Sequence, residues 1–265
     1  MLLKILFSTL VWKVLNANEV ICNFDTLTFW GLTCGISNQT IENDGKITFN
    51  IDEIAQGKSF GDVNCVEFAD VLIDFIPAEI FSTFSNADRL IFMRNGFKEW
   101  RNEFLQNAKK LIAFVNVDNL LVSLDDDSFT HTPNLLVLSL YGNQISNISE
   151  GAFRGLTQLS ILQLSGNKIS SIDEKLFRDL ESLEMLDLFD NNLPLLPSGV
   201  FDANERLQTL RLDGNKFVVI TAIVFDRNSN LKSLNVTENL IFSIDAKVLP
   251  ENLEIIYVGE SVTWK

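Results

Sequence analysis

The side chains that could carry catalysis are few in this sequence, and their spacing fits no catalytic motif. His131 is the only histidine among 265 residues, and it follows Phe129 in an expected connecting loop, an unsuitable place for the histidine of a triad. The acidic run at 125–127 is most simply a solvated loop on the outer side of the fold, with a weak calcium site as the alternative. No phosphate loop or dinucleotide fingerprint occurs in a strand-then-helix context. We therefore expect a protein that is not an enzyme and that holds no cofactor or metal.

The three cysteines indicate structural chemistry. Cys22, Cys34 and Cys65 all lie towards the N-terminus, and in an oxidising compartment two of them should form a disulfide. We interpret the segment from Cys22 to Cys34 as a disulfide-closed hairpin that covers the N-terminal end of the core. Cys65 is then the odd thiol. It could pair within this cap region, pair with another chain, or stay free, and a free thiol fits an oxidising space least well.

The first residues and the sequons indicate export. Residues 1–17 have the features of a secretory signal, with Lys4 before an apolar segment at 5–12 and a cleavage site at 15–17. A buried strand or helix of the fold is the alternative for this segment. Three N-glycosylation sequons agree with export, and they begin at Asn38, Asn147 and Asn235. No later segment approaches the ~18 apolar residues of a membrane span, so we expect a secreted, extracellular protein.

The composition limits the partners. The formal net charge is −14, whereas binding to nucleic acid needs clustered Lys and Arg to displace counterions from phosphates. We therefore expect a protein partner and no nucleic acid. The apolar content of 46% is ample for a buried core.

The sequence contains an internal repeat, and the strands and turns of this repeat must position any binding residues. The series Leu135-x-x-Leu138-x-Leu140-x-x-Asn143 returns from Leu159 with a period of 24 residues. A Phe stands eighteen residues after the start of each central copy, as in Phe129. Less regular copies of the same pattern continue towards the N-terminus, and a shorter copy follows towards the C-terminus. Eight repeats start at 63, 87, 111, 135, 159, 183, 207 and 231, and a partial ninth starts at 253.

This pattern resembles the typical subtype of extracellular leucine-rich repeats, LxxLxLxxNxLxxLxxxxFxxL, over roughly residues 63–260. The resemblance implies an α/β-type solenoid: a horseshoe with a parallel, concave β-sheet and a mostly irregular or short helical convex side. Closely spaced Leu residues point inward from each strand. The Asn that recurs at the ninth position of each repeat (the Asn column) should form hydrogen bonds with backbone groups of adjacent turns. The Phe that recurs eighteen residues after each repeat start (the Phe column) should form a stack of aromatic rings. These positions build the scaffold and carry no activity.

The ends of the solenoid need caps, because stacked repeats leave an open apolar face at each end. We expect an N-terminal cap at 18–62, before a repeat domain at 63–265. This cap is similar to those of dipteran leucine-rich immune proteins. The chain departs from those proteins in having no second cysteine cluster and no coiled-coil heptads. Residues 258–265 could form a minimal C-terminal cap with Trp264; otherwise the edge strand needs a partner.

The residues that flank the inward Leu positions should face the concave side, and the packing of the core does not require them. An apolar band bordered by acidic residues crosses the middle repeats, and such patches are typical of interaction sites. Strand propensity alone explains the Val residues but explains Tyr, Met and Phe poorly. The candidate partner-binding residues are Ile91, Met93, Val115, Val117, Val137, Tyr141, Ile161, Met185, Asp187, Phe189 and Arg211.

We therefore predict a secreted binding protein that recognises a protein partner through its concave face. Similarity to arthropod immune proteins and to Toll-like or Slit-like ectodomains implies innate immune recognition. One alternative is a matrix, adhesion or developmental protein that self-assembles through its open end and Cys65, as a homo- or hetero-oligomer. Another is a secreted inhibitor of an extracellular enzyme. A glycan at Asn235 would obstruct the C-terminal part of the concave face, so the ligand should not extend past the seventh repeat.

Overall fold

The computed structural model describes residues 19–28, 31–37, 48–51, 59–73, 75–220, 224–245, 247, 249–260 and 262–264. The expected signal segment at 1–17 and the sequon at Asn38 lie outside these residues. The side chains of residues 19–32 are likewise not described, and Cys22 is among them.

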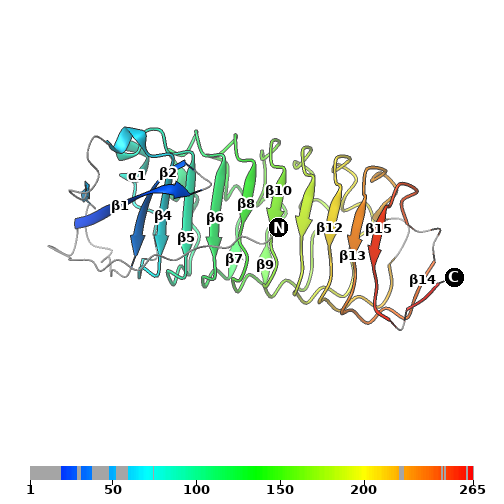
Figure 1. Cartoon of the computed structure of the whole chain (residues 1–265). Helices are drawn as coiled ribbons and strands as arrows, with labels where there is room; N and C mark the ends of the chain where they lie inside the picture. The colour runs from blue at the N-terminus through cyan, green and yellow to red at the C-terminus, as the bar shows by residue number, and fades with distance from the viewer. Residues whose placement is uncertain are drawn as a thin grey trace.

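The expected parallel-sheet solenoid is confirmed. Each repeat contributes one short strand that begins at its third position, and the strands stand side by side in one row (Figure 1). They are β4 (Cys65–Ala69), β5 (Arg89–Met93), β6 (Ala113–Val117), β8 (Val137–Ser139), β10 (Ile161–Gln163), β11 (Met185–Asp187), β12 (Thr209–Arg211), β13 (Ser233–Asn235) and β15 (Ile255–Tyr257). Neighbouring strands pair in parallel with the register of the sequence repeat, as in Ile161 with Met185. The partial ninth repeat therefore continues the sheet through β15.

The N-terminal segment extends the same sheet. Strands β1 (Glu19–Thr28) and β2 (Gly31–Ser37) are antiparallel, β2 lies parallel to β4, and β3 (Thr48–Ile51) lies parallel to β1. The sheet then has 12 strands in the order β15-β13-β12-β11-β10-β8-β6-β5-β4-β2-β1-β3. The first described strands thus provide paired neighbours for β4, which would otherwise be an open edge.

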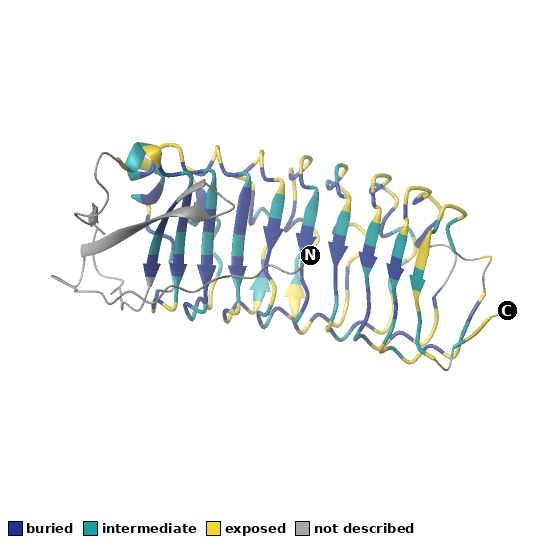
Figure 2. Cartoon of the chain, viewed as in Figure 1, coloured by how far each residue is buried: buried dark blue, intermediate teal, exposed yellow. Residues whose placement is uncertain are grey.

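The connections on the other side of the core contain little regular structure. Three short helices occur in the described part of the chain: η1 (Phe60–Asp62), α1 (Ile80–Thr83) and η2 (Asn102–Leu105). Two pairs of two-residue strands complete the solenoid, β7 (Ser123–Leu124) with β9 (Asn147–Ile148) and β14 (Ser243–Ile244) with β16 (Thr263–Trp264). Figure 2 shows the resulting pattern, in which buried residues run through the strands and exposed residues mark the turns. None of the described helices has the length and apolarity that crossing a membrane requires.

The scaffold columns pack as the repeat predicts. Inward Leu residues such as Leu138, Leu162 and Leu186 are fully buried. Asn167 donates from Nδ2 to the carbonyl of Leu140 in the preceding repeat, at 3.0 Å, and its Oδ1 accepts the N–H of Ile145. Each Asn thereby satisfies backbone groups that would otherwise be unpaired inside the core.

The Phe column forms a continuous stack on the convex side. The rings of Phe129, Phe153, Phe177, Phe201 and Phe225 lie in sequence with centroid separations of 6.1, 6.4, 5.8 and 6.5 Å. Trp100 continues the stack upstream at 5.0 Å from Phe129, and its Nε1 donates to the carbonyl of Ser128. The stack joins repeats two to seven through aromatic contacts as well as through the sheet.

Candidate binding surface on the concave face

The concave face is the side of the sheet turned away from the core. Most predicted binding residues lie on it in two rows, because parallel pairing repeats each position in the next strand, about 5 Å away. Ile91 is paired with Val115 in one row. Val137, Ile161 and Met185 are paired along the other. We call the half-buried or exposed apolar members of these rows and their neighbours the concave strip: Ile91, Val115, Val117, Val137, Tyr141, Ile161 and Met185.

Two predicted binding residues are less accessible than their repeat positions suggest. Met93 is 8% exposed and Asp187 is 4% exposed. The side chains on adjacent strands are so close that larger neighbours cover shorter ones. For the same reason Ala113 and Ser139 are buried at positions that point outward from the sheet.

Tyr141 is the most prominent member of the concave strip. It is 44% exposed and follows β8 by two residues. Gly166, in the next repeat, has φ +65°, and a β-carbon there would lie 3.3 Å from Cε2 of Tyr141. The tyrosine ring therefore lies close to a glycine that leaves room for it, and 44% of the residue stays exposed.

Phe189 has a similar position but is capped by a charged residue. Its Cε2 would lie 3.2 Å from a β-carbon at Gly214, and the guanidinium of Arg211 lies 4.8 Å from the ring centroid. This geometry is that of a cation–π contact. Phe189 is therefore half-buried by its own repeats and offers less free surface than Tyr141.

Arg211 is held in turn by two carboxylates. Its Nη1 lies 3.2 Å from Oδ2 of Asp187, and its Nη2 lies 3.0 Å from Oδ2 of Asp213. Burial raises the pKa of Asp187, against the opposing effects of the Phe189 N–H and the positive charge of Arg211. The sequence prediction included Asp187 and Arg211 but missed Asp213, whose spacing of two residues from Arg211 was the available signal. This cluster rigidifies the C-terminal part of the concave face. Arg211 is bound to side chains of this chain and is less available to a partner.

The edge of the sheet where the strands end carries a column of left-handed residues. Asp70, Arg94, Asp118, Asp190 and Glu238 have φ between 51° and 57°, and glycines fill the same place in three other repeats. A bidentate ion pair joins Arg94 to Asp70 at 2.7 and 2.8 Å. Its hydrogen bonds hold the pKa of the Asp70 carboxyl below its usual range.

The acidic run and the histidine lie on the convex connections. Oδ1 of Asp126 accepts the N–H of Gly151 at 2.9 Å, and Asp127 forms an ion pair with Arg154 at 2.8 Å. His131 is half-buried nearby. Within the described ranges no group of three or more His, Cys, Asp or Glu side chains is placed to hold a metal ion. The carboxylates of this loop therefore tie the third repeat to the fourth.

The cysteines and the sequons differ in accessibility. Cys34 is disulfide-bonded, but the Cys22 side chain lies outside the described residues, so their pairing stays a prediction. Cys65 is a free cysteine with 0% exposure. Asn147 is exposed on β9. Asn235 is half-buried on the concave face, where its Oδ1 accepts hydrogen bonds from the N–H and hydroxyl of Thr237.

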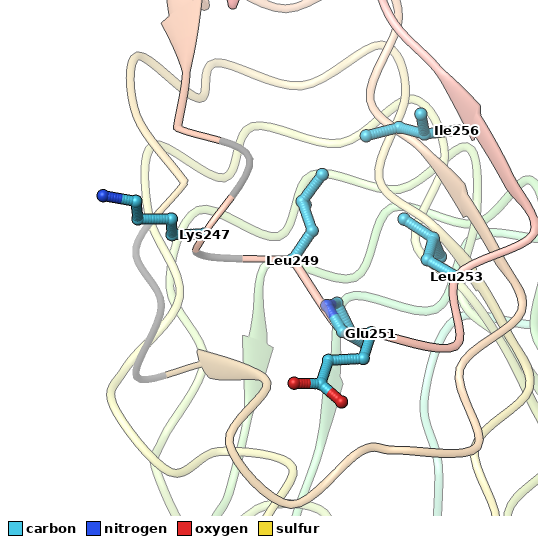
Figure 3. A pocket seen from close by; sticks show the side chains of 6 residues that line it. Lys247, Leu249, Glu251, Leu253 and Ile256 are labelled. Carbon is cyan, nitrogen blue, oxygen red and sulfur yellow. The ribbon is translucent and has the colours of Figure 1, made fainter. Parts of the chain in front are cut away.

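The C-terminal end of the sheet is only partly covered. β15 is the last strand of the sheet, Tyr257 is 52% exposed, and Trp264 is 50% exposed. A hollow of about 550 Å³ lies beside this end. The apolar side chains of Leu249, Leu253 and Ile256 turn towards it, whereas the charged ends of Lys247 and Glu251 point away (Figure 3). The described residues at 258–260 and 262–264 thus leave this end of the core partly uncovered.

Comparisons with known proteins agree with this architecture. A family profile described as "Leucine rich repeat" matches residues 117–169, 147–193 and 157–217. No curated protein matches the chain. The TLR13–ssRNA13 complex aligns at 24% identity with a TM-score of 0.61, over 69% of this chain and 28% of that one. The Toll–Spatzle complex, described as a molecular hub in Drosophila development and innate immunity, aligns at 18% identity with a TM-score of 0.56, over 85% of this chain and 36% of that one. Its glycosylated form aligns at 20% identity and 0.57, over 79% and 31%.

These likenesses establish the fold. The chain spans about a third of the length of the solved structures it matches. The family profile covers the repeats from the third to the seventh, and the parallel register carries the same geometry through the described strands on either side. The chain therefore contains leucine-rich repeats, and its described residues form a leucine-rich-repeat solenoid.

Proposed function

We propose that the chain is an extracellular binding protein that recognises a protein partner through the concave strip. The observation that carries this proposal is Tyr141, an aromatic side chain 44% exposed that lies beside the half-buried apolar rows of the concave strip. Aromatic anchors in apolar surroundings contribute most of the affinity at protein interfaces. A strand needs no tyrosine at this position for its own stability, because Ser165 occupies the equivalent place in the next repeat.

Innate immune recognition is the finer form of this proposal. Its support is the similarity of the fold to two structures of the Toll–Spatzle complex. Another matched complex contains single-stranded RNA. A nucleic acid ligand is disfavoured for this chain, because its formal net charge of −14 would repel phosphates.

The proposed ligand occupies the N-terminal and central repeats. Asn235 faces the concave side beyond the seventh repeat, and a glycan there would occupy the space above β13 and β15. The guanidinium of Arg211 is already paired with the carboxylates of Asp187 and Asp213. The central part of the concave strip holds the exposed Tyr141 and the half-buried Val115 and Val137, and we place the ligand there.

Two variants test this proposal with a matched control. Tyr141 and Tyr257 are the only tyrosines, and both are about half exposed on the same face. The immobilised full chain and its Tyr141→Asp and Tyr257→Asp variants would be exposed to extracellular fluid of the source animal. We expect one protein to be retained by the wild type and by Tyr257→Asp, and to be reduced at least tenfold on Tyr141→Asp, a loss of about 1.4 kcal/mol.

Equal retention by all three proteins, with unchanged thermal unfolding, would overturn the proposal. The main alternative is self-assembly through the open end and Cys65, and the Cys65 part of it is disfavoured because that thiol is fully buried. Enzyme inhibition uses the same concave contacts, so the identity of the retained protein separates it from immune recognition.

A further inference from the structure

A second apolar surface lies on the flank of the solenoid, away from the concave face. Its members are large side chains that are more than half exposed in the sixth to eighth repeats. We call them the flank patch: Leu195 at 59%, Val218 at 52%, Val219 at 55%, Leu240 at 58% and Phe242 at 75% exposure. The flank patch follows the buried Asn column in each repeat, where the chain leaves the sheet and turns towards the convex side.

The members of the flank patch are neighbours because the repeats stack in register. The N–H of Lys216 donates to the carbonyl of Leu193 at 2.9 Å, and the N–H of Leu240 donates to the carbonyl of Phe217 at 2.8 Å. This register places Val218 beside Phe242 and Leu195 beside Val219, at the spacing of about 5 Å between successive turns. These two stacked pairs form the centre of the patch, and Leu240 lies two residues before Phe242 in the same repeat.

The scaffold does not require apolar residues at these positions. The equivalent places in the fourth and fifth repeats hold Ser146 with Asn147, and Ser170 with Ser171. Core packing is supplied by the residues on either side, such as Phe217 and Ile220, which are buried. Strand propensity does not explain the patch either, since 218 and 219 lie outside the assigned strands.

The size of the patch is that of an interaction site. Five side chains with these exposed fractions present on the order of 500 Å² of apolar surface, in the upper part of the range for the largest patch on a monomer. A standard interface buries about 800 Å² on each partner. The flank patch can thus form the apolar centre of such an interface, with the surrounding polar residues as its rim.

We propose that the flank patch binds the flank patch of a second copy of this chain about a two-fold axis. In such a contact the same surface serves both partners, so it must be complementary to itself. The patch meets this condition because its centre carries no charge and its rim carries both signs. The exposed rim residues are Asp190, Lys216, Glu238, Asp245 and Lys247. An acidic chain of this net charge repels its copies elsewhere, so contact is favoured where Lys and acidic residues alternate.

Sedimentation velocity of the full, glycosylated chain tests the proposal. We expect a dimer at micromolar concentrations, and we expect Val218→Asp to weaken dimerisation at least tenfold. Val122→Asp is the matched control: Val122 is 51% exposed at the same repeat position of the third repeat, and its variant should dimerise as the wild type does. Raising the salt concentration should preserve or strengthen the dimer, because apolar contact is not screened whereas repulsion between acidic copies is.

Phe242→Ser provides a second variant with a smaller perturbation, in case Val218→Asp reduces folding. Loss of the dimer by either variant, with the circular dichroism spectrum of the folded chain retained, supports the proposal. A wild-type chain that is monomeric throughout, or a dimer that survives both variants, overturns it. The outcome is independent of the concave-face proposal, because Tyr141→Asp leaves the flank patch intact.

Discussion

Tyr141 depends on a glycine in the following repeat for its position. A β-carbon at Gly166 would lie 3.3 Å from the tyrosine ring and 3.3 Å from the backbone nitrogen of Gly142. The φ of +65° adds the strain of a left-handed conformation, about 1–2 kcal/mol for a residue with a side chain. The accessible aromatic surface is thus set by two residues from successive repeats of the chain.

Gly166→Ala should lower the free energy of unfolding by more than Gly155→Ala does. Gly155 has φ +79°, and a β-carbon there would meet nothing within 4 Å, so its substitution incurs the backbone strain alone. Gly166→Ala adds tight contacts of 3.3 Å with the backbone nitrogen of Gly142 and with the Tyr141 ring, so these neighbours must shift. Urea unfolding of the two variants measures the difference, which we expect to be about 1 kcal/mol or more. Equal destabilisation would mean that the close approach of Gly142 and the Tyr141 ring does not constrain position 166.

Cys65 should make the protein less stable at alkaline pH. Burial, and secondarily Glu67, raises the pKa of its thiol from 9.0 to about 12. Above pH 9 the unfolded chain loses this proton while the folded chain keeps it, so the unfolded state is favoured as pH rises. The slope from this one group is about 1.4 kcal/mol for each pH unit between the two values.

Urea unfolding at about pH 8 and about pH 10.5, on either side of the ordinary thiol pKa, measures this effect. Cys65→Ala is the comparison, since it lacks the thiol and keeps every other titrating group. The wild type should lose more stability than Cys65→Ala over this interval. A wild-type Cys65 that reacts rapidly with a thiol reagent in the folded state, or equal pH slopes, would contradict the buried position.

At the scale of elements, the Asn column holds adjacent repeats together. The Nδ2 of Asn191 donates to the carbonyls of Leu164 and Leu188 at 3.0 and 3.2 Å, and its Oδ1 accepts the N–H of Ile169 at 3.0 Å. Removing the amide leaves these backbone groups unpaired inside the core. An unpaired buried group costs roughly 1–3 kcal/mol.

Asn191→Ala should therefore reduce the free energy of unfolding by about 3 kcal/mol. Asn192→Ala, one residue along, is the control: its side chain is half-exposed and lies outside the column, so we expect a change below about 0.5 kcal/mol. Thermal or urea unfolding distinguishes the two. If both substitutions had the same small effect, the column would not be a stabilising element.

The scaffold elements were the predictable part of this molecule. The environment of a scaffold position is the same in every repeat, as for Leu138, Asn143 and Phe153. The same residue type therefore recurs there, and the repeat can be recognised from spacing alone. The accessibility of Met93 and Asp187 was wrongly anticipated, because it depends on side chains in adjacent strands. These neighbours lie one repeat away in the chain and vary from repeat to repeat.

The flank patch was missed for a related reason. Its signal was present in the sequence as apolar residues at non-scaffold positions, such as Val218 and Phe242. The sequence does not show that these side chains are exposed, because it does not show which residues beside them are buried. The alternating pattern of the strands gives no information about these positions. The Arg211 contact with Phe189 likewise required the geometry, because no spacing rule predicts which cation covers a ring.

At the scale of the whole molecule, the solenoid separates two surfaces. The concave strip lies on the sheet, while the flank patch lies where the chain has left it, so association through one leaves the other accessible. Stability is distributed along the repeats, since each contacts mainly its neighbours. The C-terminal end, where Leu253 and Ile256 border a hollow, should be the first part to open, and hydrogen exchange would locate it.

The central claim is that a protein partner contacts the concave strip. Photo-crosslinking tests it most directly, with benzoylphenylalanine placed at Tyr141 in one protein and at Lys175, exposed on a convex connection, in another. Each would be irradiated in extracellular fluid of the source animal. We expect a covalent adduct with one partner from position 141 and none from position 175. Adducts from position 175 alone, or equally from both positions, would contradict recognition through the concave face.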